Sequence, residues 1–351
     1  MACRVLITGH LGYLGSVFVP RFQEAGHSVT GLDTGYFEPC RLDGPEVPAA
    51  RAVPEIRKDL RDLAPSDLRG FDAVVHLAAL SNDPIGNLNS RWTSAINDEG
   101  SLRLAELARA AGVSRFLFSS SCIMYGAAGQ GEVDETSPLD PKTDYARSKV
   151  AAERAISALA SDTFSPVFLR NGTIYGLSPR MRLDTVTNQF AASALTTGVV
   201  AIHGDGTPWR PVVHVEDVAS AFLSAIEAPR ARLHNRAINV GAEESNHTII
   251  EIAEEVARQV KGSRIERLSR PDADNRTYRA RFDLIGKLLP GFRPRWSLAR
   301  GVDQLCRGLS GLDRAAYDGP KYVRLRWLAS LIERGAVDAD LRLGRSREVA
   351  A

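Results

Sequence analysis

Several features are scarce in this chain of 351 residues, and each scarcity argues against a class of protein. It holds four cysteines without a C-x-x-C pair, and no cysteine–histidine cluster has metal-ligand spacing. No uncharged apolar run reaches the roughly 18 residues that a membrane-spanning helix needs. A net charge of +2 gives no strong attraction to nucleic acid or to a membrane surface. We therefore expect a reduced, cytoplasmic chain that binds no metal, no nucleic acid and no membrane.

What is present is an alternation of short apolar segments with helical patterns in the first half of the chain. We expect strands at residues 4–8, 28–33, 71–77 and 115–119, and an amphipathic helix at residues 101–111. Such an alternation is typical of a parallel sheet wrapped by helices. The predicted fold class is therefore α/β, a Rossmann-type doubly wound parallel sheet with a smaller C-terminal lobe.

A glycine-rich turn joins the first expected strand to the first expected helix. Gly9, Gly12 and Gly15 stand at GxxGxxG spacing, with Tyr13 and Leu14 between the last two. Glycine permits a tight turn and a close backbone approach to a pyrophosphate, and a helix N-terminus attracts the phosphates. A purely structural turn is the alternative, but the order of strand, turn and helix favours a dinucleotide site.

A carboxylate at the end of the second expected strand indicates which dinucleotide is bound. Asp33 stands 24 residues beyond Gly9. A carboxylate there accepts hydrogen bonds from both hydroxyls of the adenosine ribose and repels a 2′-phosphate, so NAD is favoured over NADP. Asp59 and Leu60 follow a third strand-like run. They either contact the adenine or form a solvated turn, and the residues alone favour neither.

Tyr145 and Lys149 are the most informative pair in the sequence. Their spacing of four places both side chains on one face of a helix. A nearby ammonium favours the phenolate form of a tyrosine, which can then take a proton from a hydroxyl while a hydride leaves the same carbon. Such a pair alone is weak evidence for a catalytic site. The evidence is stronger here because Ser119, Ser120 and Ser121 and the glycine-rich turn precede the pair in the sequence.

Together these motifs resemble the extended short-chain dehydrogenase/reductase family, specifically its nucleotide-sugar epimerase/dehydratase branch. The resemblance covers roughly residues 4–309. Besides the residues above, it rests on three further motifs, which are His76-Leu77-Ala78-Ala79, Cys122-Ile123-Met124-Tyr125-Gly126, and Gly204-Asp205-Gly206-Thr207 with Arg210 and Asp217.

The resemblance implies a role for each matching position. Ser121, Tyr145 and Lys149 would be catalytic. NAD would be bound by residues of the first half of the chain, namely Gly9, Gly12, Tyr13, Leu14, Gly15, Asp33, Asp59, Leu60, Leu77, Ala78, Ala79, Tyr145 and Lys149. A nucleotide-diphosphate sugar would be bound by Ser121, Cys122, Asn188, Arg210 and Arg276, with the arginines serving its phosphates. The alternative for Asn188, Arg210 and Arg276 is that they are polar surface residues on loops with no role in binding.

The implied chemistry begins with Tyr145 taking a proton from a sugar hydroxyl while NAD accepts the hydride, which gives a keto-sugar. Epimerisation, reduction, decarboxylation and dehydration share this step. The 4,6-dehydratases of the family carry Asp and Glu directly after their catalytic threonine, whereas Cys122 and Ile123 follow Ser121 here. Isoleucine has no proton to exchange, and a buried cysteine is more often a small packing residue than an acid or base.

We therefore expect an NAD-dependent nucleotide-sugar epimerase that acts at C4 through a transient 4-keto-sugar. A ketoreductase, a decarboxylase or an atypical dehydratase on the same scaffold are the alternatives, and a non-catalytic NAD-binding sensor is a further one. A ketoreductase commonly takes up NADPH, which Asp33 would disfavour.

The chain is expected to divide where loops with prolines interrupt the strand–helix pattern, after Gly176. The expected parts are an NAD-binding Rossmann domain at 1–176 with 212–241 returning to it, a nucleotide-sugar-binding lobe at 177–211 and 242–312, and a helical extension with a tail at 313–351. The resemblance also implies a homodimer formed through two sheet-flanking helices of each subunit.

Overall fold

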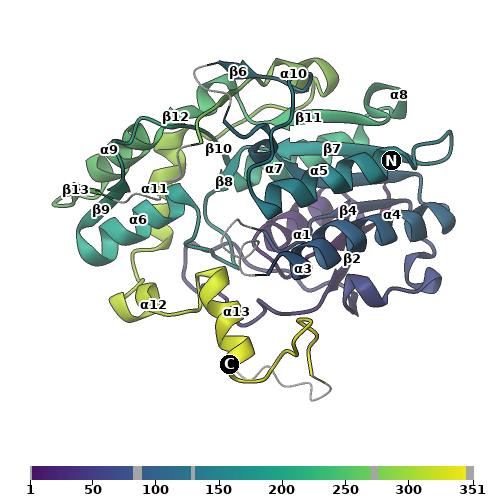
Figure 1. Cartoon of the computed structure of the whole chain (residues 1–351), viewed down its shortest axis with the longest axis horizontal. Helices are drawn as coiled ribbons and strands as arrows, with labels where there is room; N and C mark the ends of the chain where they lie inside the picture. Colours follow the sequence, from purple (N-terminus) through teal and green to yellow (C-terminus); the bar gives the residue numbers. More distant parts are fainter. Residues whose placement is uncertain (1, 82–88, 128–130, 270–275, 345–351) are drawn as a thin grey trace.

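The structure, a computed structural model, describes residues 2–81, 89–127, 131–269 and 276–344. Its centre is a parallel sheet of seven described strands in the order β11-β7-β5-β4-β1-β2-β3 (Figure 1). These strands are β1 (Arg4–Thr8), β2 (Ser28–Asp33), β3 (Glu55–Arg57), β4 (Ala73–His76), β5 (Arg115–Ser121), β7 (Ser165–Asn171) and β11 (Arg236–Val240). The strand order reverses between β1 and β4, and sheets of this type bind ligands at the carboxyl ends beside that point.

Alternate side chains of the central strands pack against helices on opposite faces of the sheet. Val5 and Ile7 belong to the apolar cluster that contains Phe18 and Phe222, whereas Leu6 belongs to a second cluster on the other face. The first face is covered by α1 (Gly15–Glu24) and α7 (Val215–Glu227), and the second by α4 (Gly100–Ala110) and α5 (Asp144–Ser157). Two short helices also belong to this part of the chain: α3 (Ser90–Thr93) precedes α4, and α8 (Arg230–Leu233) follows α7. Burial on both faces explains the continuous apolar runs, and the predicted fold class is confirmed.

A smaller lobe of short strands and helices adjoins the central sheet. β10 (Trp209–His214) pairs with β8 (Thr173–Tyr175) and β12 (Asn246–Thr248), and β9 (Val199–His203) pairs with β13 (Arg264–Leu268). β6 (Glu132–Val133) pairs with β14 (Arg279–Ala280). The accompanying helices are α6 (Val186–Thr197), α9 (Ile249–Gln259), α10 (Asp283–Leu288), α11 (Leu298–Gly308) and α12 (Arg314–Asp318).

Residues 212–214, where the chain was expected to return to the Rossmann domain, lie outside the central sheet. They lie in β10, which pairs with β8 in a separate sheet. Gly172 separates β7 from β8, and a Cβ there would lie 3.0 Å from Pro211 O, so a side chain at this position would crowd β10. After β10, α7, α8 and β11 rejoin the central domain, where α7 contacts β5 and both α8 and β11 contact β7.

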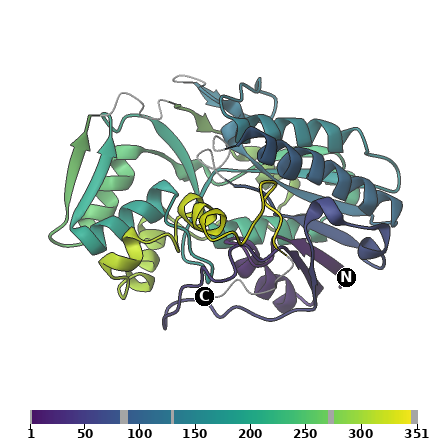
Figure 2. The same ribbon diagram turned by 60° about the horizontal axis from the view of Figure 1, so that its bottom comes forward.

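The C-terminal part of the chain returns across the molecule. Its helix α13 (Arg324–Glu333) lies between the lobe and the central sheet, as the yellow helix in Figure 2 shows. Trp327, Leu328 and Leu331 of this helix pack with Tyr36 near the end of β2. None of the described helices is long and apolar enough to cross a membrane. The rest of the expected tail, residues 345–351, lies outside the described residues.

Candidate active site

A cavity of about 880 Å³ opens at the carboxyl ends of the central strands, within the size range of cofactor and ligand sites. Most of the predicted site residues line it, namely Gly9, Gly12, Tyr13, Leu14, Asp33, Asp59, Leu60, Leu77, Ala78, Ala79, Ser121, Tyr145, Lys149, Arg210 and Arg276. Gly15, Cys122 and Asn188 are not among the described lining residues. The parallel sheet thus brings together residues from widely separated parts of the chain.

The glycine turn is packed too closely to accept side chains. Gly9 has a φ of +74°, and a Cβ there would lie 2.8 Å from Ala78 N. A Cβ on Gly15 would lie 2.3 Å from Gly9 O, so this third glycine serves the turn itself. Gly9 and Gly12 line the cavity where α1 begins, and such bare backbone at a helix N-terminus fits the pyrophosphate of a dinucleotide.

Asp33 ends β2 and presents its carboxylate beside the same turn. Its Oδ2 accepts a hydrogen bond from Leu11 N at 3.0 Å, and its Oδ1 accepts one from Gly35 N at 2.8 Å. Burial raises the pKa of this carboxyl, and the two backbone donors oppose that change. A carboxylate held in this way at the cavity wall fits the adenosine ribose. Asp59 also lines the cavity, but Arg61 forms an ion pair with it at 2.6 Å.

Helix α5 carries Tyr145 and Lys149 on the face that borders the cavity. The hydroxyl of Thr143 caps this helix, so Tyr145 stands in its first turn. Lys149 is 4% exposed, and its Nζ donates to Ser119 O at 2.8 Å and lies 5.8 Å from the centre of the Tyr145 ring. Burial lowers the pKa of Lys149 to about 8, although the charge of Glu153 raises it. The lysine ammonium is close enough to favour the tyrosine phenolate.

Ser121 is the last residue of β5 and faces the same cavity. Its Oγ accepts a hydrogen bond from Ile123 N at 3.3 Å and so caps the 3₁₀ turn Cys122–Tyr125. Because a hydroxyl both accepts and donates, the Ser121 O–H can still donate to a substrate oxygen. Together, β5 and α5 place a hydroxyl, a phenol and an ammonium at one wall of the cavity.

A family model for the NAD-dependent epimerase/dehydratase family matches residues 5–241, which is more than half of the chain. The chain belongs to the NAD-dependent epimerase/dehydratase family. NAD is therefore its cofactor, in agreement with the sequence prediction and with the fit of the glycine turn and Asp33.

Relatives of this epimerase/dehydratase catalyse different reactions. The UDP-glucose 4-epimerase of Streptomyces lividans is 28% identical over 295 residues, which are 77% of this chain and 85% of that protein. The structure of MoeE5 in complex with UDP-glucose and NAD has a TM-score of 0.74 at 28% identity, covering 87% of this chain and 98% of that chain. DesIV, a dTDP-glucose 4,6-dehydratase from Streptomyces venezuelae solved with NAD and TYD bound, has a TM-score of 0.75 at 25% identity. The match covers 88% of this chain and 97% of DesIV.

In this member of the family, Cys122 lies behind the cavity wall. Its side chain is fully buried, and its Sγ donates to Arg170 O at 3.1 Å. Burial raises the pKa of the thiol, and the charge of Arg170 only partly opposes this change. A thiol in such surroundings is suited to packing. The position therefore favours packing over the predicted substrate contact.

Asn188 is also fully buried, and it braces the cofactor side of the epimerase/dehydratase fold. Its Oδ1 accepts from Gly176 N at 3.0 Å, while its Nδ2 donates to Tyr13 OH at 3.2 Å and to Arg182 O at 3.0 Å. These bonds join α6 to the glycine turn. Asn188 thus acts on the site through Tyr13, whereas a direct substrate contact was predicted.

Arg210 and Arg276 bring two guanidinium groups to the lobe side of the cavity. Arg210 belongs to β10, and its Nη1 donates to Trp209 O at 2.9 Å and to the backbone oxygen of Arg276. Both arginines line the cavity. Two forked cations at one place are suited to a diphosphate, which is the role that the family resemblance implies for them.

Asn97 supports the site but was not predicted from the sequence. It lies in the π-helical turn Ser94–Glu99, where its side chain accepts from Leu80 N at 2.8 Å and donates to Leu80 O at 3.0 Å and Ser148 Oγ at 3.3 Å. It thereby fixes α5 against the loop that follows β4. Helical turns of this kind are frequent at functional sites, but one asparagine in an amphipathic pattern gives no signal in the sequence.

Asn171 ends β7 and Thr173 begins β8, at the point where the chain leaves the central sheet. Both line the cavity. Asn171 Nδ2 donates to Ser119 Oγ at 3.1 Å and to Ser120 O at 3.0 Å. Asn171 therefore positions the strand that ends in Ser121.

Proposed function

We propose that this chain is an NAD-dependent nucleotide-sugar epimerase that inverts C4 through a transient 4-keto-sugar. The observation that carries the proposal is a single cavity lined by Ser121, Tyr145 and Lys149 from the central domain and by Arg210 and Arg276 from the lobe side. A sugar joined to a nucleoside diphosphate would place its ring near the tyrosine and its phosphates near the arginines.

Proton transfer would be carried out by residues of this chain. Tyr145 would take the proton of the C4 hydroxyl, since the Lys149 ammonium favours its phenolate, and Ser121 would hold the same oxygen by a hydrogen bond. NAD, when bound, supplies a hydride acceptor that later returns the hydride. Tyr145 would then give the proton back to the oxygen once the other face of the ketone is presented. Because the hydride and the proton are both returned to the sugar, the reaction would consume no cofactor.

Dehydration would need a further acid and base near the sugar ring, and the described cavity wall does not offer them beside Ser121. Ile123 lines the wall there and has no proton to exchange. The carboxylates among the described lining residues are Asp33, Asp59 and Asp184. Each is engaged, the first by backbone N–H groups and the other two by arginines. This supports epimerisation over dehydration.

Reduction and decarboxylation are the nearest alternatives. MoeE5 has been solved with UDP-glucose and also with UDP-glucuronic acid, so likeness to it does not choose the sugar. A reductase must exchange its cofactor in each turnover and commonly uses NADPH, which the carboxylate of Asp33 disfavours. The homodimer implied by the family resemblance stays a prediction.

A screen of UDP-, dTDP-, GDP- and CDP-sugars, read by mass spectrometry and NMR, tests the proposal. An epimerase interconverts two sugar nucleotides of equal mass without net use of NAD. Net consumption of NAD(P)H would identify a reductase instead, and loss of water or of CO2 would identify a dehydratase or a decarboxylase. Binding of NAD with no turnover of any sugar would favour the sensor.

The variant Tyr145→Phe tests the role of the phenol. Turnover should fall by a factor of about 10²–10⁴, the usual contribution of a general acid–base group, while NAD content and the unfolding temperature stay close to wild type. Tyr317→Phe is a matched control, because Tyr317 is half-buried in α12 and is not among the described lining residues. Wild-type turnover in Tyr145→Phe would contradict the mechanism.

A further inference from the structure

Helix α13 brings an arginine to the cofactor side of the cavity from outside the region matched by the family. Arg324 is the first residue of this helix, whereas the family match ends at residue 241. Arg324 lines the same cavity as Gly12 and Asp33. The C-terminal extension therefore contributes directly to a site that is otherwise built from the central domain and the lobe.

The guanidinium of Arg324 is buried but incompletely bonded. It is 3% exposed, its Nη2 donates to Arg180 O at 2.7 Å, and its Cζ lies 4.6 Å from the centre of the Phe37 ring. Its Nη1 has no hydrogen-bond partner among the described residues. An unsatisfied buried cation costs free energy, so this group is suited to a further, anionic partner at the cavity.

Two more arginines add positive charge at this place, and together with Arg324 we call them the arginine cluster. Arg182 pairs with Asp184 at 2.6 Å, but Arg180 Nε and Nη1 have no hydrogen-bond partner among the described residues. Burial lowers the pKa of Arg324 to about 10, and the charges of Arg182 and Arg180 act in the same direction. Among the described residues, Asp184 is the carboxylate that pairs directly with the arginine cluster, and the charges of Glu38 and Asp33 also act on Arg180. The cluster still holds donors that an added anion could use.

The arginine cluster is tied to the glycine turn by two buried side chains. Ser178 Oγ donates to Tyr13 O at 2.8 Å and accepts from Arg180 N at 3.2 Å. Asn188 Nδ2 bridges Tyr13 OH and Arg182 O, as described above. The cluster therefore adjoins the glycine turn, the part of the cavity that fits a pyrophosphate, and the charge of Arg182 also acts on Tyr145. Arg210 and Arg276, which are proposed to bind the sugar nucleotide, lie instead at the side of the cavity formed by the lobe.

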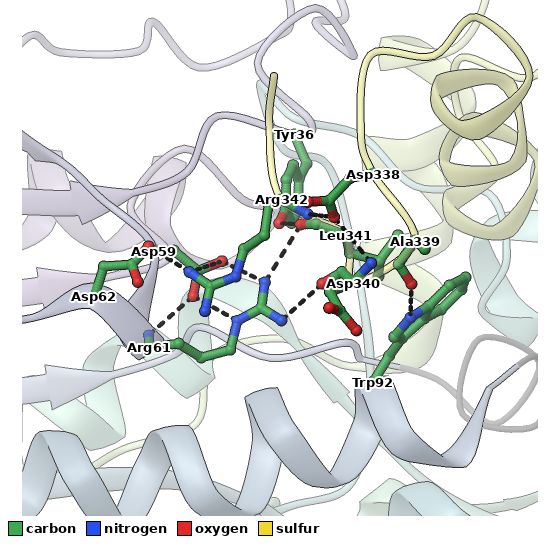
Figure 3. A network of polar contacts seen from close by, with 10 residues as sticks. All are labelled: Tyr36, Asp59, Arg61, Asp62, Trp92, Asp338, Ala339, Asp340, Leu341 and Arg342. Carbon is green, nitrogen blue, oxygen red and sulfur yellow. Dashed lines mark hydrogen bonds and ion pairs between the residues drawn. The ribbon is translucent and has the colours of Figure 1, made fainter. Parts of the chain in front are cut away.

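Residues 336–343, which follow α13 and are called the strap here, fasten this helix to the central domain (Figure 3). Backbone oxygens of the strap accept hydrogen bonds from Tyr36, from Arg61 at 2.7 Å and from Trp92 at 2.8 Å. All three donors lie in the first third of the chain. The strap thus joins α13 to the loops around the predicted adenosine site.

An ion pair and an indole complete this attachment. Arg342 Nη1 lies 4.0 Å from Oδ2 of Asp59, one of the predicted adenine contacts (Figure 3). Trp327 of α13 is buried, and its Nε1 donates to Tyr36 O at 2.6 Å. These contacts fix the start of α13 at the cavity.

We propose that Arg324 binds the diphosphate group of NAD, so that the C-terminal segment is part of the cofactor site. Its Nη1 would donate to a phosphate oxygen and so acquire the partner that it lacks among the described residues. The proposal rests on NAD as the cofactor and not on the epimerase reaction, so it can succeed or fail independently of the proposed function.

The test compares Arg324→Gln with Arg326→Gln, a matched control two residues further along the same helix at an exposed position. Affinities for NAD and for UDP are measured by calorimetry on the full chain after removal of bound NAD. Arg324→Gln should bind NAD at least about tenfold more weakly, because a charge-assisted hydrogen bond is lost, and should bind UDP as wild type does. Arg326→Gln should match wild type for both ligands.

The melting temperature separates this role from a structural one. Without NAD, Arg324→Gln should melt no lower than wild type, because it removes an uncompensated buried charge, and added NAD should raise its melting temperature less. Unchanged NAD affinity would overturn the proposal. A loss confined to UDP would overturn it too, because the anion would then be the substrate diphosphate. Should Arg324→Gln fail to fold, Arg324→Lys keeps the charge without the forked donor, and wild-type NAD affinity in that variant would overturn the proposal as well.

Discussion

Replacing Lys149 by methionine should stabilise the folded chain at neutral pH, although it removes a residue of the proposed mechanism. Burial lowers the pKa of Lys149 from 10.5 to about 8. In the unfolded chain the lysine has its ordinary pKa, so folding buries an ammonium at a cost of about 3 kcal/mol at pH 7. Methionine is of similar length and carries no charge. The loss of the hydrogen bond from Nζ to Ser119 O offsets about 1 kcal/mol of the gain.

The dependence on pH gives the sharper test of this reasoning. Because the folded pKa lies below the unfolded pKa, the penalty is fully present below pH 8 and disappears as the pH rises towards 10.5. The free energy of unfolding of Lys149→Met minus that of wild type should therefore fall by about 2 kcal/mol between pH 7 and pH 9.5. Changes in packing affect this difference equally at both pH values, so they do not imitate the effect.

Urea unfolding of the cofactor-free proteins, followed by tryptophan fluorescence at the two pH values, measures this difference. Lys287→Met is a matched control, because the Lys287 side chain is 71% exposed on α10 and its replacement should give no such dependence on pH. If the free energy of unfolding of Lys149→Met minus that of wild type is the same at pH 7 and pH 9.5, then burial of the Lys149 ammonium does not destabilise the folded chain as assigned.

Two further predictions concern single side chains of the site. Asp33→Ala should lower the preference for NAD over NADP by about tenfold or more, because the carboxylate that repels a 2′-phosphate is gone; titration of both cofactors measures the ratio, and an unchanged ratio would contradict the assigned role. Cys122→Ala should keep turnover within about threefold of wild type while lowering the free energy of unfolding by about 1 kcal/mol, since the thiol is packed behind the cavity wall. Loss of turnover without loss of stability would indicate instead that Cys122 takes part in the reaction.

The elements that could be predicted are those defined by short-range patterns. Strands at residues 4–8 and 28–33 occur as predicted, because their apolar runs are bounded by clear turns. The glycines, Asp33 and the Tyr145–Lys149 pair line one cavity, since the carboxyl ends of parallel strands share one edge of the sheet. The strand at 71–77 is shorter than predicted, as Ala73–His76, and the one at 115–119 is longer, as Arg115–Ser121.

Contacts between distant segments could not be predicted. Nothing in the sequence shows that Cys122 faces β7 or that Asn188 reaches Tyr13, because both contacts depend on how whole elements pack. Arg324 did leave a signal, since it shares its helical face with Trp327, Leu328 and Leu331 at spacings of three, four and seven. A charge on an apolar face indicates a buried partner, but it does not say which surface supplies that partner.

Helix α13 and the strap are synthesised well after the surface that they cover. Tyr36, Leu80 and Ile96 are buried against Trp327 and Leu331. Until α13 is made, this apolar patch would lack the side chains that bury it. A product cut short before residue 324 would keep the patch exposed although every strand of its central sheet is present. Cellular quality control would thus have a place at which to distinguish truncated from finished chains.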